Sequence, residues 1–197
     1  MGAIFQSLGR TIIAGIVLLI LIILLTSAAT GTMIEFNHAW STFFMRWLHV
    51  LSGIMWIGLL WYFNFVQIPS MPKIPDEQKP AIGKVIAPTA LFWFRWAALA
   101  TVVTGVLLAT MSGYIVTALM LTRPFLAIGI GMWLALIMAF NVWFIIWPNQ
   151  KKALGIVQVE PAEKAAAARL AMLTSRANTM LSIPMLFCMV AQQNGGL

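Results

Sequence analysis

The stretch from Thr11 to Ala29 has no charged residue and consists mainly of Ile, Leu, Val and Ala. A helix of about 20 apolar residues crosses the ~30 Å hydrocarbon core of a bilayer. Across the 197-residue chain, 61% of residues are hydrophobic and 9% are charged, against about 25% charged in an ordinary soluble domain. A soluble domain of this size could not hide that much apolar surface. The sequence therefore predicts an integral membrane protein and excludes a soluble enzyme, a disordered protein and a secreted disulfide scaffold.

Four further apolar segments follow the first. We expect an all-α integral membrane protein, a bundle of about five transmembrane helices forming a single domain over residues 1–197. The expected spans are 11–29, 43–67, 89–110, 124–147 and 175–192. The fifth is less regular, because Pro184 interrupts it. The polar stretch Pro161–Arg176 before it is either an interfacial helix or an extension of the fifth span.

The basic residues are distributed unevenly between the two sides of the predicted bundle. Nine lie before the first span or in the loops after the second and fourth spans: Arg10, Lys73, Lys79, Lys84, Lys151, Lys152, Lys164, Arg169 and Arg176. Only Arg46 and Arg123 lie on the opposite side. The positive-inside rule then places the N-terminus in the cytoplasm and the C-terminus outside. The net charge of +7 reflects this rule and, without a dense basic run, predicts no nucleic-acid partner.

Motifs of soluble enzymes are absent from the sequence, which has no phosphate-binding loop, no Gly-x-Ser-x-Gly and no Cys-x-x-Cys. The five carboxylates, Glu35, Asp76, Glu77, Glu160 and Glu163, fall in predicted loops. An ion-coupled transporter usually keeps a carboxylate at membrane depth. The sequence therefore argues against such a transporter.

Among the residues of the predicted spans, His49 in the second span is the one best suited to bind a metal or cofactor. Gly53 and Trp56 follow one and two turns later on the same face. A missing side chain beside a histidine, with an aromatic wall beyond it, suits a flat macrocycle such as haem, whose iron takes axial histidine ligands. Arg46, three residues nearer the surface, would then reach a propionate. The alternative interpretation is a hydrogen-bonded histidine at a helix interface, with Gly53 present for close packing. Both stay open.

Arg95 is the one basic residue expected well inside a span. One interpretation is that its side chain extends to the cytoplasmic interface. The other is that it serves as a counter-charge for an acidic ligand group, such as a haem propionate or an anionic lipid. The other polar residues within spans, Asn64, Gln67 and Asn141, are accounted for by hydrogen bonds between helices.

Several segments resemble a known family. Arg46–Gly58, continuing through Trp61–Gln67, resembles the second span of the urate oxidase N-terminal membrane domain of PuuD-type, cytochrome c-linked bacterial urate hydroxylases. Trp143–Lys152 and Ser175–Phe187 resemble later parts of the same family, so the similarity extends over about 46–190. A broader similarity, an Arg-x-x-His…Trp-x-Gly helix, is to HemJ-type, haem-associated protoporphyrinogen oxidases.

The resemblance implies a haem-ligand role for His49, with haem b as the cofactor. The helical spacing then places Gly53, Trp56 and Arg46 beside that haem. The sequence lacks the Cys-x-x-Cys-His of an attached cytochrome c. We therefore expect a non-catalytic transmembrane subunit of a larger respiratory or photosynthetic electron-transfer complex in the bacterial inner membrane. Its expected partners are other membrane subunits, lipids and a cytochrome c on the outer face. The alternative is an oxidoreductase, the membrane component of a urate hydroxylase that passes electrons to a separate cytochrome c. A porphyrin-handling oxidase is a third interpretation.

Overall fold

The computed structural model describes residues 2–196, which are helical and contain no β-strand. The chain divides into two compact units, the first ending at Ser41 and the second beginning at Thr42. Within the described residues, four helices are long and apolar enough to cross a membrane: Leu8–Thr30, His38–Lys73, Lys79–Met111 and Leu126–Ala153. The all-helical fold is thereby confirmed, and four of the expected spans coincide with helices that are long and apolar enough to cross a membrane.

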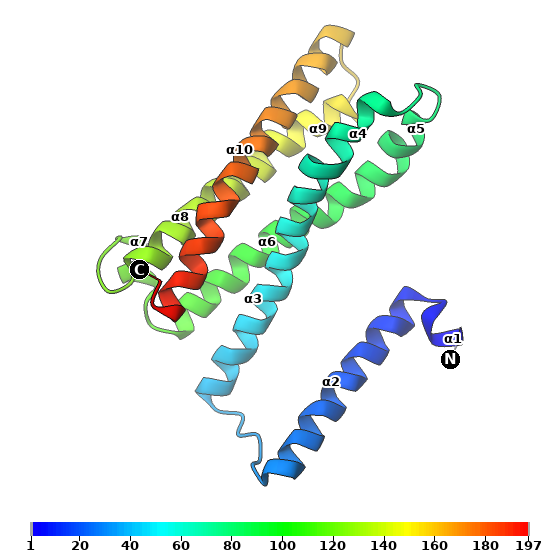
Figure 1. The fold of residues 1–197 in the computed structure, drawn as a ribbon. Helices are drawn as coiled ribbons and strands as arrows, with labels where there is room; N and C mark the ends of the chain where they lie inside the picture. Colours follow the sequence, from blue (N-terminus) through cyan, green and yellow to red (C-terminus); the bar gives the residue numbers. More distant parts are fainter. Residues whose placement is uncertain (1, 197) are drawn as a thin grey trace. The chain divides into compact units, whose positions relative to one another are not determined.

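The first unit consists of the short helix α1 (Gly2–Phe5) and the long helix α2 (Leu8–Thr30) (Figure 1). No side chain of α2 is buried, although nearly all of them are apolar. The helix ends at Gly31, which has a φ of 67°. This left-handed conformation closes helices and costs glycine nothing, because glycine has no Cβ. α2 therefore has the properties of a helix whose whole circumference requires an apolar environment.

The remaining helices belong to the second unit, apart from the first turn of α3. In chain order they are α3 (His38–Trp61), η1 (Tyr62–Gln67), α4 (Ile68–Ser70), η2 (Met71–Lys73), α5 (Lys79–Ala81), η3 (Ile82–Ile86), α6 (Ala87–Met111), α7 (Ile115–Leu119), α8 (Leu126–Phe140), η4 (Asn141–Ile146), α9 (Trp147–Ala153) and α10 (Pro161–Asn194). Several of these continue directly into one another. The helices that begin as α3 and α5 are thus longer than the expected spans 43–67 and 89–110.

Three of these segments, η1, η3 and η4, are π-helical. Each ends two residues before a proline: 62–67 before Pro69, 82–86 before Pro88, and 141–146 before Pro148. Proline has no N–H to donate and its ring collides with the carbonyl four residues earlier. A wider turn just before the proline accommodates both effects. Two of the wide turns carry an asparagine, Asn64 and Asn141, and therefore change the direction in which these side chains point.

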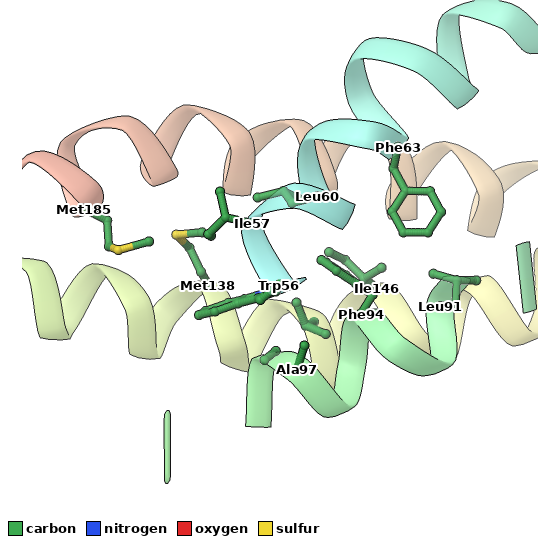
Figure 2. Close-up of a cluster of buried hydrophobic side chains, with 12 residues drawn as sticks. Trp56, Ile57, Leu60, Phe63, Leu91, Phe94, Ala97, Met138, Ile146 and Met185 are labelled. Atoms are coloured by element: carbon green, nitrogen blue, oxygen red, sulfur yellow. The ribbon is translucent and has the colours of Figure 1, made fainter. Parts of the chain in front are cut away.

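The core of the second unit lies where α3, α6, α8 and α10 meet (Figure 2). Trp56, Leu60, Phe94, Met138 and Val142 have at most 1% of their surface exposed. Helices in a bilayer gain little from transferring apolar side chains out of lipid, so close van der Waals packing holds such a core together.

α10 runs antiparallel to α8 in this unit (Figure 1). Its buried side is lined by small and polar residues at helical spacing: Ala167, Ala171, Ser175, Asn178, Ser182, Met185, Cys188 and Ala191. A Cβ added to Gly131 of α8 would lie 3.1 Å from the Cβ of Cys188. The two backbones can therefore approach closely only because these residues are small.

α10 also decides between the two interpretations of the polar stretch before the fifth expected span. Residues 161–194 form one continuous helix, which runs through Pro184 without ending. The polar stretch is therefore an extension and not a separate helix. α10 is not among the four described helices that are apolar enough to cross a membrane, so a fifth span at 175–192 stays a prediction.

Candidate functional site

His49 points from α3 to α6. Its Nδ1 lies 3.0 Å from the backbone oxygen of Thr101 and 3.2 Å from Oγ1 of Thr104. A carbonyl oxygen can only accept, so Nδ1 carries the proton in this arrangement. The Thr104 hydroxyl donates to the backbone oxygen of Ala100 at 2.6 Å and is free to accept from Nδ1. In the neutral ring, Nε2 is then the unprotonated nitrogen, which is the form that binds a metal.

Gly105 on α6 makes room for this ring. A Cβ at position 105 would lie 2.8 Å from Cε1 of His49 and 3.2 Å from its Nδ1. Contacts below 3.0 Å are not tolerated, so any other residue at position 105 would displace the imidazole. The sequence alone does not indicate that His49 is the group that Gly105 contacts.

The other three residues of the predicted haem site are placed differently. Gly53 lies against α6, where an added Cβ would be 4.0 Å from Cγ2 of Thr101. Trp56 is completely buried in the core, and Arg46 is exposed. His49 and Gly53 thus both face Thr101, whereas Trp56 contributes to core packing. The haem itself stays a prediction, and no group of three or more His, Cys, Asp or Glu side chains among residues 2–196 is arranged to hold a metal ion.

A second polar cluster joins α10 to α8 and η4. Asn141 donates from Nδ2 to Oδ1 of Asn178 at 2.8 Å. Asn178, which has none of its surface exposed, donates in turn to the backbone oxygen of Met138 at 2.9 Å. One asparagine pair therefore fixes the rotation of α10 relative to α8.

The same cluster continues to the end of α3 and to η1. Nε1 of Trp61 donates to Oγ of Ser182 at 3.0 Å, and Nδ2 of Asn64 donates to Oγ of Ser175 at 2.8 Å. We call Trp61, Asn64, Asn141, Ser175, Asn178 and Ser182 the α10 polar network. The sequence analysis predicted interhelical bonds for the first two asparagines but missed their partners on α10. Their spacing was the available signal, because polar residues at 175, 178 and 182 occupy one helical face.

The network does not satisfy every buried group. Among the described residues, Oδ1 of Asn64, Oε1 of Gln67, and the indole nitrogens of Trp56 and Trp143 are buried without a hydrogen-bond partner. Buried polar atoms are usually paired, so each such atom is a place where a ligand or water would be favourable. The bundle thus has hydrogen-bonding capacity that its own side chains do not use.

Arg95 on α6 is the charged residue of the interior. Only 9% of its surface is exposed, and its Cζ lies 3.4 Å from the ring centre of Trp147. Nζ of Lys151 lies 5.7 Å from the same ring. Nε and Nη1 of Arg95 are buried without a partner. The side chain therefore points towards the basic α9, as a side chain extending to the interface would, but its N–H groups stay unpaired.

Comparison with known proteins gives one match. Residues 121–195 match the family described as urate oxidase N-terminal. No curated protein and no solved structure matches. The match confirms the resemblance to the urate oxidase N-terminal family for a segment that contains α8, η4, α9 and α10. This segment includes Asn141, Asn178 and Trp147, whereas His49 and Arg95 lie outside it.

Proposed function

We propose that this chain is a transmembrane subunit of an electron-transfer complex, related to the membrane component of urate hydroxylases, and that His49 ligates haem b through Nε2. The proposal extends to topology: α10 is the fifth span of a bundle in the bacterial inner membrane, with the N-terminus in the cytoplasm. Trp61, Asn64 and Asn141 hold α10 in place through hydrogen bonds. A helix with polar groups on its buried side can enter a bilayer when neighbouring helices satisfy those groups.

The observation that carries the haem proposal is the orientation of the imidazole. Nδ1 is bonded to the backbone oxygen of Thr101, and within residues 2–196 the structure gives Nε2 no hydrogen bond. Histidines that ligate a metal almost always donate their other ring N–H to a carbonyl or carboxylate, which fixes tautomer and orientation. Gly105 adds steric support, since its missing side chain leaves the ring in this place. Bound haem would supply one-electron transfer.

Spectroscopy of purified variants tests this proposal. The native protein should give a pyridine haemochrome spectrum of haem b, and His49→Ala should abolish the Soret band. His38→Ala is the matched control, because it removes the other histidine and should keep the band. Gly105→Ala should weaken haem retention by displacing the ring without removing the ligand. A native protein without Soret absorption, or an unchanged band in His49→Ala, contradicts the proposal.

The family match supports a second candidate, the membrane component of a urate hydroxylase that passes electrons to a separate cytochrome c. This activity would need a place for a planar, polar substrate, and the unpaired Oδ1 of Asn64 and Nε1 of Trp143 are available donors and acceptors. The test is reduction of added cytochrome c by the purified chain in the presence of urate, with omission of urate as the control. Absence of urate-dependent reduction contradicts this candidate. It does not affect the subunit proposal, which the haem spectra test separately.

A further inference from the structure

The buried guanidinium of Arg95 has no acidic partner in the described part of the chain. The ion pairs found between residues 2 and 196 are Lys79–Asp76 at 2.6 Å and Lys152–Glu163 at 2.7 Å. A guanidinium does not lose its proton in a protein, so Arg95 is a charge with two unsatisfied buried nitrogens. Burying a charge without a counter-charge is strongly unfavourable. An anion would therefore be a favourable partner for Arg95.

Trp147 and Lys151 define the side from which this anion would come. The guanidinium lies 3.4 Å from the centre of the Trp147 ring, which attracts the cation through its π electrons. The ring accepts no hydrogen bond in its plane, so stacking leaves the N–H groups unused. The ammonium of Lys151 approaches the same ring at 5.7 Å. Two cations therefore lie against one indole, which makes the surroundings of Arg95 positively charged.

Three neighbours of Arg95 on α6 are apolar and exposed, whereas Leu91, Phe94 and Ala98 are buried. Phe92 and Leu99, one turn before and after, have 47% and 39% of their surface exposed, and Trp96 has 47%. These residues cover the outward-facing flank of a helix that is apolar enough to cross a membrane. A molecule with an anionic headgroup and apolar chains would fit here, because its headgroup could reach Arg95 while its chains lie along this apolar flank.

We infer that Arg95, stacked on Trp147 and assisted by Lys151, binds a phosphate group, supplied by the headgroup of an anionic phospholipid or by free phosphate. Arg and phosphate match in geometry, because the planar guanidinium donates several N–H bonds in one plane. This site does not rest on the haem proposal. His49 contacts α6 at Thr101 and Gly105, which lie six and ten residues from Arg95, about 9 and 15 Å along the helix.

Native mass spectrometry of the full chain in a non-ionic detergent tests the inference. The probes are phosphatidylglycerol, phosphatidylcholine and inorganic phosphate, each titrated separately. We expect the wild-type chain to retain phosphatidylglycerol at least tenfold more tightly than phosphatidylcholine. Arg95→Gln should reduce that affinity at least tenfold. The matched control is Lys152→Gln, which removes the same charge from α9, one position before its end, and should change the affinity less than twofold.

The outcomes separate the two sources of phosphate. Retention of phosphatidylglycerol with no effect of inorganic phosphate identifies a lipid site, and saturable binding of inorganic phosphate alone identifies a free-anion site. Should Arg95→Gln fail to fold, Arg95→Lys keeps the charge but lacks the guanidinium plane, and it should bind more weakly than the wild type. Equal loss in Arg95→Gln and Lys152→Gln, unchanged affinity in Arg95→Lys, or no preference for either phosphate probe in the wild type overturns the inference. The titration is repeated with His49→Ala, and the affinity for the phosphate probes should be unchanged, because this site does not depend on haem.

Discussion

α2 and α10 are both long helices, but they deal with their surroundings in opposite ways. α2 is almost wholly apolar and has no buried residue. α10 carries lysine, arginine, asparagine and serine, and it buries Asn178, Ser175 and Ser182 against other helices. Hydropathy identifies α2 at once and misses α10. The difference teaches that hydropathy measures readiness to contact lipid, whereas several hydrogen bonds between the helices of this bundle are made by a helix whose buried side is polar.

The largest expected effect concerns whether α10 crosses the membrane. A reporter that is active only outside the cytoplasm, fused after Leu197, should be fully active. The same reporter inserted after Gly155, in the turn between α9 and α10, should be inactive. Because the positive-inside rule places the basic α9 in the cytoplasm, a spanning α10 must put the two fusions on opposite sides. Equal activity at both positions would show that α10 does not cross.

The next effect concerns packing on α10. Met185 is buried in the core at 4% exposure, and Met185→Ala should lower the free energy of unfolding by about 2 kcal/mol. This value is at the low end for such truncations, because lipid also solvates the methionine side chain and mainly the van der Waals contacts are lost. Circular dichroism during unfolding in increasing SDS measures it. An effect below 0.5 kcal/mol, the usual range of surface substitutions, would contradict the buried position.

A smaller effect is expected from the α10 polar network. Asn178→Leu removes the bonds to Asn141 and Met138. Interhelical hydrogen bonds in membranes average about 0.6 kcal/mol each, so the expected loss is about 1 kcal/mol. Asn194→Leu is the matched control on the same helix, because Asn194 is exposed and bonds only to Val190 one turn earlier. Equal losses in the two variants would mean that the network does not fasten α10 to α8.

The sequence predicted the elements better than it predicted their partners. Uncharged apolar runs indicated α2 and the central parts of α3, α6 and α8, because the requirement of crossing lipid acts on each helix separately. The second helix was ended too early and the third was started too late, since Lys73 and Lys79 were expected in a loop and lie in helices. Proline at position 184 suggested an interruption that the packed helix does not show.

The sequence predicted which residues belong to the candidate sites, but it did not predict their contacts, and the reason is physical. His49 and Arg95 stood out because a polar residue within a span is costly. Their contacts, Thr101 and Trp147, each lie 52 residues further along the chain. Which residues meet across two helices depends on the rotation and register of both, and the periodicity of one helix does not contain that information. Gly105 illustrates the point, since its need to be glycine comes entirely from a ring on another helix.

The smallest expected effect returns to α2. Leu21 has 48% of its surface exposed, so Leu21→Ala should change the unfolding free energy by less than about 0.5 kcal/mol. The side chain can exchange contacts with helix neighbours for contacts with detergent or lipid of equal polarity, and no cavity forms. Both variants are measured in the same SDS titration and both replace a large apolar side chain with alanine. They therefore differ mainly in whether the side chain is buried in protein or exposed. If Leu21→Ala instead cost as much as Met185→Ala, α2 would be packed against protein in the folded state, and the contrast between the two helices would fail.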